Sequence, residues 1–473
     1  MALDVSLRSA GPTSVYTRSL HATNKVAAAF DPWDSVSRTV DPEMYTYPRV
    51  TTASTALLKE PPRRVTMLVR DLIDDSLYNP NYGYFAKQAV IFSPEKQFDF
   101  GRLRDHLQFM DLLNKMYRRF DEQQGSEDVD YTARQVWHTP TELFKPWYGY
   151  AIAKYMVAEY KLNLYPHRDL IIYEMGAGNG TLMRNILDYI REYEPAVYTR
   201  TQYRIIEISE ALAKQQARQL TRVNQKEPHH CVEIINQSIF DWDEKVEDEC
   251  FFIAMEVIDN FAHDLIRYDT DTGEPFQGVV GVDPEGDYSE LYEAVGSDAL
   301  IARYLKTRRQ TNYKTPALSH HIFRKLKNSL LPYSSNLSKP EFIPTRLFQF
   351  LEQLRDHFPR HRLILSDFYQ LPDTIPGIDA PVVQTRYKGT MVPCSTYMVQ
   401  PGWFDIFFPT NFELLRDMYH IVCRKDRPIN ERLVKVLPHR DFLERYADLE
   451  MTRTRSGENP MLMYYENVKM LLT

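Results

Sequence analysis

The stretch Asp169–Met183, DLIIYEMGAGNGTLM, constrains the fold more than any other part of the chain. An apolar run, Leu170–Tyr173, leads into Glu174 and then into three alternating glycines, and apolar residues at helical spacing follow. The glycines are Gly176, Gly178 and Gly180. This pattern predicts a buried strand, a tight turn and an amphipathic helix. Glycine suits the turn because a ligand can lie against bare backbone and because some positions need a positive φ. The N–H groups that open the helix favour a negatively charged ligand group.

Two classes of nucleotide site use such a glycine turn. A dinucleotide-binding turn has the spacing G-x-G-x-x-G, but here the third glycine comes one residue early and Thr181 follows it. The spacing G-x-G-x-G behind an acid instead resembles the first motif of class I S-adenosylmethionine methyltransferases. A structural strand–helix turn without a ligand is the alternative.

Strand-forming runs alternate with helical patterns beyond this stretch. The further predicted strands are Tyr203–Ile208, Cys231–Ile235, Cys250–Val257 and Arg362–Ser366. The run from Cys250 is almost continuously apolar, as a parallel strand covered on both faces requires. The alternation predicts an α/β fold with a doubly wound, Rossmann-like sheet that is mostly parallel.

Acidic residues fall at the ends of these predicted strands, and ligands of such sheets bind beyond the carboxyl ends of the strands. The acids are Glu174, Glu207, Asp241 and Glu256, with Asp259 just beyond. Each could also be an ordinary exposed residue at a strand end. His263 is a candidate base, although we expect a solvent-facing position for it.

Charge and cysteine usage narrow the class of protein. A net charge of −7 and a pI near 6.0 argue against a protein that coats nucleic acid. Four scattered cysteines without C-x-x-C pairing fit a reducing compartment without a zinc site. No window reaches the ~18 apolar residues of a membrane span. The run Arg303–Lys327 holds eight basic residues and no acid, which fits a solvated helical face or a docking surface.

The chain divides into a leader, a cap, a core and an insertion. The first residues are rich in Arg and Ser and poor in acids, which is typical of a mitochondrial transit peptide, although a disordered tail is the alternative. We predict a leader at 1–45, a helical cap at 46–165, a core at 166–265 and 362–473, and an inserted substrate or partner region at 266–361. Helices are expected from Val65 to Ile73, from Thr139 to about Tyr160 and from Asn411, and a hairpin over 274–293.

Six segments resemble, in the same order, motifs of the MidA-like family of class I methyltransferases. They are Leu77–Phe85, Thr139–Phe144, Glu174–Leu182, Ile206–Ser209, Ala254–Phe261 and Gln400–Phe412. The match extends over most of the chain after residue 62. Met255 and Ala262 stand where the family has asparagine and proline, so the chain resembles a divergent member. The family includes a mitochondrial protein arginine methyltransferase of respiratory complex I assembly.

The residue chemistry suggests a role for each candidate. Glycines 176, 178 and 180 would let the methionine part of S-adenosyl-L-methionine lie against the backbone, with Glu174 beside it. Glu207 would accept hydrogen bonds from the ribose diol, and Asp241 would take the adenine amine. Glu256 and Asp259 would stand where the methyl group is delivered, and a carboxylate there would hold a planar guanidinium.

The resemblance implies a mitochondrial matrix S-adenosylmethionine-dependent protein arginine methyltransferase. Its substrate would be a subunit of respiratory complex I, with no metal, no membrane span and no nucleic acid as partner. Two alternatives stay open: a non-catalytic assembly factor with the same fold, and an RNA methyltransferase that uses the basic run.

Overall fold

The structure is a computed structural model that describes residues 42–87, 90–94, 96–124, 136–137, 139–220, 228–296, 298–315, 337–372, 374–387, 390–424 and 433–473. The predicted leader 1–45 lies almost wholly outside these residues. The predicted basic run extends outside them from residue 316 onward. The division into a leader, cap, core and insertion stays a prediction.

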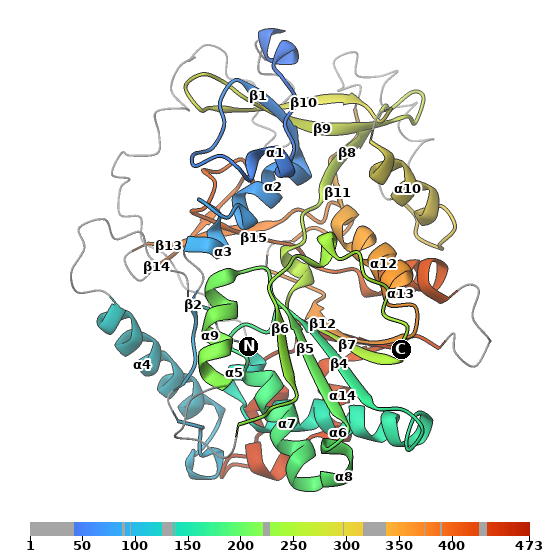
Figure 1. The fold of residues 1–473 in the computed structure, drawn as a ribbon. Helices are drawn as coiled ribbons and strands as arrows, with labels where there is room; N and C mark the ends of the chain where they lie inside the picture. The colour runs from blue at the N-terminus through green and yellow to red at the C-terminus, as the bar shows by residue number, and fades with distance from the viewer. Residues whose placement is uncertain are drawn as a thin grey trace.

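A seven-stranded sheet forms the centre of the fold, in the order β16-β17-β12-β7-β4-β5-β6 (Figure 1). Its strands are β4 (Leu170–Met175), β5 (Thr201–Ile206), β6 (Val232–Ile235), β7 (Cys250–Met255), β12 (His361–Phe368), β16 (Lys435–Pro438) and β17 (Val468–Leu472). The neighbours from β6 to β12 pair in parallel, whereas β17 runs antiparallel to β12 and β16. The five predicted core strands are all present.

The α/β class is therefore confirmed, and parallel pairing within the central sheet is limited to the five strands from β6 to β12. The central sheet is mixed, because the unpredicted strands β16 and β17 close its edge in antiparallel pairing. The two larger sheets outside it are wholly antiparallel. The sequence of Val468–Leu472 does not indicate whether this strand runs parallel or antiparallel to its neighbours, because its direction depends on the rest of the fold.

Both faces of the central sheet are buried, because successive side chains of a strand point to opposite faces. Leu170 and Ile172 of β4 pack in one apolar cluster, and Ile171 and Tyr173 pack in another. The first cluster contains residues of α6 (Trp147–Asn163), α7 (Thr181–Tyr193) and α14 (His439–Tyr446), and the second residues of α10 (Ala299–Arg308), α12 (Thr345–His357) and α13 (Phe412–Tyr419).

A second, antiparallel sheet lies beyond the carboxyl ends of the central strands, at the top of Figure 1. It consists of β1 (Val65–Leu68), β8 (Asp264–Tyr268), β9 (Pro275–Val282), β10 (Tyr288–Ala294) and β11 (Glu341–Ile343). β9 and β10 form the predicted hairpin, and Gly286 in its turn has a φ of 94°.

The predicted helix from Val65 to Ile73 is wrong at its start. Val65–Leu68 is strand β1 and pairs with β9, and α2 (Val69–Tyr78) begins only at Val69. The apolar run fits both helical spacing and a strand buried on both faces, and pairing with β9 selects the strand.

The predicted helix from Thr139 is divided in two. Thr139 caps α5 (Pro140–Leu143), accepting a hydrogen bond from the Glu142 N–H, and α6 begins after Pro146. The helix at the carboxyl side begins as predicted, because the Asn411 side chain caps α13.

The remaining elements complete the described chain. The helices are α1 (Thr52–Thr55), α3 (Tyr84–Lys87), α4 (His106–Gln124), α8 (Pro195–Tyr198), α9 (Glu210–Leu220) and α15 (Pro460–Met463). The strands are β2 (Val90–Ile91), β3 (Val136–Trp137), β13 (Val382–Tyr387), β14 (Thr390–Cys394) and β15 (Asp405–Phe407). The 3₁₀-helices are η2 (Pro42–Thr46), η3 (Phe100–Arg102), η4 (Ile239–Asp241), η5 (Ile258–Asn260) and η8 (Leu449–Thr452), and η6 (His420–Arg424) is a π-helix. Among the described helices, none is both long and apolar enough to cross a membrane.

Candidate functional site

The glycine turn between β4 and α7 adopts a conformation that side chains resist. Gly176, Gly178 and Gly180 have φ values of 69°, 52° and 74°, in the left-handed region. A Cβ atom on Gly178 would lie 2.6 Å from Cδ1 of Ile91, and one on Gly176 would lie 3.0 Å from Cγ2 of Val257. The turn therefore keeps bare backbone at the carboxyl end of β4.

Glu142 braces this turn from the helix that precedes the core. Its Oε1 accepts hydrogen bonds from Asn179 Nδ2 at 3.0 Å and from Thr181 Oγ1 at 2.7 Å. Lys145 Nζ lies 3.3 Å from the other oxygen. Glu142 is 2% exposed, so these donors replace the water that its carboxylate loses. Glu142 was expected only as part of a helix start, and the one signal of this role was the resemblance of its segment to a family motif.

Glu207 follows β5 and is tied to the glycine turn through Gln216 of α9. Its Oε1 accepts a hydrogen bond from Ser209 N at 2.9 Å, and its Oε2 accepts one from Gln216 Nε2 at 3.0 Å. The same Nε2 donates to the Gly178 carbonyl at 2.8 Å. Gln216 Oε1 is buried, and it has no hydrogen-bond partner in the described part of the chain. Burial raises the pKa of Glu207.

Glu174 lies within β4, one residue before its end, and its side chain is buried. Its Oε2 accepts a hydrogen bond from the Tyr203 hydroxyl at 2.7 Å. Burial raises the pKa of Glu174 to about 7, although the Tyr203 hydrogen bond opposes the shift. The carboxyl group is thus held inside the sheet beneath the turn.

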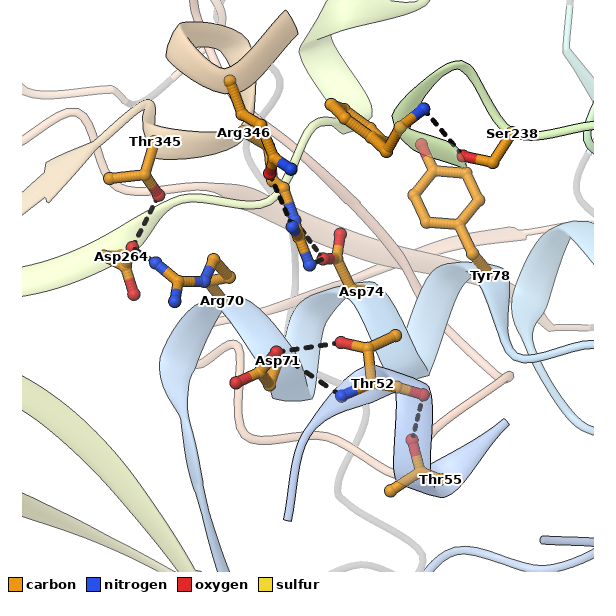
Figure 2. Close-up of polar contacts among 12 residues, drawn as sticks. Thr52, Thr55, Arg70, Asp71, Asp74, Tyr78, Ser238, Asp264, Thr345 and Arg346 are labelled. Carbon is orange, nitrogen blue, oxygen red and sulfur yellow. Dashed lines mark hydrogen bonds and ion pairs between the residues drawn. The ribbon is translucent and has the colours of Figure 1, made fainter. Parts of the chain in front are cut away.

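Asp241 ends η4 and is exposed, while its neighbour Phe240 is held by contacts with three residues. Phe240 N donates to Ser238 Oγ at 3.2 Å, and Gln353 Nε2 donates to the Phe240 carbonyl at 3.0 Å. The Arg346 guanidinium lies 5.5 Å from the centre of the Phe240 ring and forms an ion pair with Asp74 of α2. Figure 2 shows Arg346 reaching down to Asp74.

Glu256 occupies a strained position directly after β7. Its φ is 54°, a left-handed value that costs a non-glycine residue roughly 1–2 kcal/mol. A hydrogen bond from Glu256 N to the Ser366 carbonyl, 2.9 Å long, fixes this conformation. Strain of this kind is concentrated at functional sites.

Two buried carboxyl groups share the region with Glu256, which is itself half-buried. Asp259 lies in η5, and Asp367 lies near the end of β12. Asp367 Oδ2 accepts hydrogen bonds from Ile258 N at 3.0 Å and from Asp259 N at 3.2 Å, so it fixes the turn that carries Asp259. We call Glu256, Asp259 and Asp367 the carboxylate cluster.

The carboxylate cluster resists ionisation. Burial raises the pKa of all three groups, and the negative charge of Asp259 raises the pKa of Glu256 and of Asp367 further. A cation that enters the cluster would lower these pKa values, because it stabilises the ionised form. The cluster is therefore suited to a cationic acceptor and to a proton released beside it.

The wall next to the cluster comes from α2 and from the carboxyl-terminal part of the chain. The Tyr78 hydroxyl donates to the Asn260 carbonyl at 3.2 Å, and Asn260 Nδ2 donates to Asp405 Oδ1 at 3.0 Å. His263 is buried and stacks on Phe408 with the ring centres 3.8 Å apart, so the expected solvent-facing position is wrong. Burial lowers the pKa of His263 to about 3, which keeps the imidazole neutral.

The structure brings the predicted residues to one edge of the central sheet. Glu174, Glu207 and Glu256 lie at or directly after the carboxyl ends of three parallel strands, with the glycine turn among them. Asp241 lies farther along the chain from β6, at the surface. Asp367, Gln216 and Glu142 join the arrangement without having been predicted. In the described part of the chain, no group of three or more metal-ligating side chains could hold a metal ion.

Removal of the Glu142 carboxylate tests whether its hydrogen bonds to Asn179 and Thr181 hold the glycine turn in place. We expect Glu142→Leu to leave Asn179 Nδ2 and Thr181 Oγ1 without their charged acceptor, at a cost of about 1–3 kcal/mol in stability. The turn should loosen, and the affinity for a ligand bound there should fall. Thermal unfolding and calorimetric titration would measure both effects. Glu142→Gln keeps one acceptor oxygen and should lose less; equal losses would contradict the assigned contacts.

Comparison with known proteins agrees with this geometry. Residues 151–429 match the model of a family described as "Putative S-adenosyl-L-methionine-dependent methyltransferase". The protein named "Protein arginine methyltransferase NDUFAF7 homolog, mitochondrial" from Schizosaccharomyces pombe is 24% identical over 80% of this chain and 79% of its own length. The protein of that name from Saccharomyces cerevisiae is 20% identical over 78% of this chain and 87% of its own length.

A solved structure shares the fold over most of both chains. It is the crystal structure of a COG1565 superfamily member from Burkholderia thailandensis bound to S-adenosyl-homocysteine. The two chains superpose with a TM-score of 0.50 at 13% identity, covering 89% of each. At this identity the likeness concerns the fold alone.

Proposed function

This chain belongs to that family of S-adenosyl-L-methionine-dependent methyltransferases, and we propose that it methylates arginine in a mitochondrial protein. The observation that carries the proposal is the carboxylate cluster, which stands beside the glycine turn at the same edge of the sheet. The names of the two yeast relatives support both the mitochondrial location and the arginine acceptor. A doubly wound, Rossmann-like sheet is the arrangement that the parallel strands and the two buried faces support best.

The residues of the turn fit S-adenosyl-L-methionine. The left-handed backbone at Gly176 and Gly178 would contact the methionine part, and the N–H groups that open α7 suit its carboxylate. Each oxygen of Glu207 carries one hydrogen bond, so a lone pair on each remains for a ribose hydroxyl. Gln216 Oε1 is a buried acceptor that a second hydroxyl would satisfy.

The adenine end of the site is less enclosed. Asp241 is exposed and would accept from the adenine amine, and the restrained Phe240 beside it would border the ring. Glu174 would not contact the cofactor directly, because its carboxyl group is hydrogen-bonded to Tyr203. It would instead support the glycine turn. All these assignments rest on the placement of the residues around one turn.

The carboxylate cluster would hold the acceptor. The bound cofactor supplies a methyl group on an activated sulfonium, which the acceptor nitrogen displaces in line. Glu256 and Asp259 would hold the planar guanidinium by its N–H groups and direct the attacking nitrogen. The new C–N bond forms as the C–S bond breaks, and the nitrogen then loses one proton. A carboxylate of the cluster, whose pKa burial already raises, would take that proton.

Acid should suppress methyl transfer well above the usual range of carboxyl groups. The cluster must be ionised to hold a cation, and burial raises the pKa of Asp259 to about 7. We therefore expect kcat/KM to fall as the pH drops through 7, where an exposed aspartate would keep activity to about pH 4. Asp259→Asn removes a like charge from Glu256, so the remaining activity should persist to lower pH. An acid limb near pH 4 in the wild type would argue against the buried cluster as the acceptor site.

A subunit of respiratory complex I is the substrate that the resemblance favours, and the matrix is the corresponding compartment. The test uses complex I from cells that lack this protein, purified enzyme and S-adenosyl-L-methionine with a deuterated methyl group. Mass spectrometry should find the label on arginine of one subunit. Label on lysine, or none on any subunit, would refute the proposed substrate, whereas calorimetric binding of the cofactor tests the enzyme class separately.

A further inference from the structure

A large hollow lies at the amino-terminal ends of the parallel strands of the central sheet, whereas the glycine turn lies at their carboxyl ends. Its empty space measures about 1480 Å³, part of it open to solvent. Residues at the start of β12 line it, together with α6, the loop before β7, β16 and the end of β17. β12 has eight residues, so the hollow lies roughly 20 Å from the carboxylate cluster at its other end. It is therefore separate from the site described above.

Positive charge exceeds negative charge in this hollow, although the chain as a whole has a net charge of −7. The cationic lining residues are Arg360, Arg362, Arg424 and Lys435, and the acidic ones are Glu159 and Glu249. Arg362 forms a long ion pair with Glu159, with 3.6 Å between Arg362 Nη1 and Glu159 Oε2. In the described part of the chain, Arg360, Arg424 and Lys435 make no ion pair. The surplus is thus a local property of the hollow.

Arg424 is the most informative of these cations because it is 94% buried, being only 6% exposed. Its Nη2 donates to the His361 carbonyl at 3.0 Å and to Thr473 Oγ1 at 2.9 Å, both of them neutral acceptors. Its Nε is buried, with no hydrogen-bond partner among the described residues. Arginine is almost never fully buried unless it is paired with an anion. The side chain is also fixed, since its guanidinium lies 5.7 Å from the centre of the Tyr419 ring.

We propose that this hollow binds a phosphate-bearing small molecule, with the phosphate held between Arg424 and Lys435. A phosphate carries more charge than a carboxylate and offers more acceptor oxygens, so it suits several cations around one space. On the Arg424 guanidinium, Nη2 already donates to His361 and Thr473 and Nε is buried, so Nη1 is the group that would donate to a phosphate oxygen. Arg360 and Lys435 are exposed and can move onto the ligand, whereas Arg424 is already in place.

The remaining lining leaves room for an organic part. Tyr155, Leu164, Leu433 and Leu472 add apolar surface to the hollow. The Tyr155 ring is held edge-on against Phe442, with the ring centres 5.7 Å apart. A ligand with a phosphate end and a flat or apolar end would use both kinds of surface.

Titration of the full chain with inorganic pyrophosphate tests the proposal. Isothermal calorimetry at constant ionic strength should show saturable binding at one site, and the Tm should rise with pyrophosphate concentration. Arg424→Met should weaken binding by at least about tenfold, because it removes a charge-assisted contact. Lys435→Met and Arg360→Met alter exposed residues, so they keep the test valid if the Arg424 variant does not fold.

Lys154→Met is the matched control, because Lys154 is exposed on the same helix α6 and does not line the hollow. It removes the same charge and should leave binding unchanged. A second titration with ADP tests the binding of the organic part. If ADP binds more tightly than pyrophosphate, the organic part contacts the apolar surface of the hollow. If both bind equally, the hollow recognises only the phosphates. No saturable binding by the wild type, equal weakening by Lys154→Met, or binding only of an RNA oligonucleotide would overturn the proposal.

Discussion

Glu256→Gln should reduce methyl transfer at least about 100-fold while leaving the binding of S-adenosyl-L-methionine unchanged. Glutamine has nearly the same shape as glutamate, but it cannot carry the charge that holds a guanidinium or take a proton from it. The glycine turn, Glu207 and Gln216 do not depend on the Glu256 side chain. Single-turnover rates and calorimetry would separate the two effects.

The same variant should be more stable than the wild type, and increasingly so at higher pH. Burial raises the pKa of Glu256 in the folded state above its unfolded value. Its contribution to stability is therefore fully present below the unfolded pKa and is lost as the pH rises through the folded pKa. Glutamine is never ionised and avoids that loss. Glu244→Gln, the same change at an exposed position, should alter neither activity nor Tm. A Glu256→Gln enzyme with wild-type rates would remove this residue from the reaction.

Gly178→Val should abolish detectable binding of S-adenosyl-L-methionine. The new Cβ would lie 2.6 Å from Ile91 Cδ1, and a β-branched residue resists the φ of 52° at this position. Strain alone should cost roughly 1–2 kcal/mol, so thermal unfolding must accompany the binding measurement. Gly101→Val is the control, since a Cβ on Gly101 would meet nothing closer than 3.7 Å and its φ is not positive. Cofactor binding by a folded Gly178→Val protein would place the ligand elsewhere.

Much of the core could be predicted because local signals and the final fold agree there. The glycine spacing after Leu170–Tyr173 requires a turn, and the helix behind it begins at Thr181 as the pattern indicates. The acids at the ends of the strands could be found because parallel strands bring their carboxyl ends to one edge.

Contacts between distant segments could not be predicted. Val65–Leu68 satisfies a helical pattern, and only its partner β9, over two hundred residues away, makes it a strand. Asp367 follows an ordinary apolar run, and its function as the acceptor for the turn of Asp259 depends on β12 lying beside β7. His263 is buried only because Phe408 covers it. The local sequence around these residues does not indicate these contacts.

We propose that the glycine turn and the carboxylate cluster form the two halves of one methyl-transfer site. A crystal structure with S-adenosyl-homocysteine and an arginine peptide tests it most directly. We expect the amino-acid part of the nucleoside to lie on Gly176 and Gly178 and the ribose on Glu207. The sulfur should face a guanidinium held by Glu256 and Asp259. A ligand bound away from the turn, or an arginine that does not reach the cluster, would show that the two do not form one site.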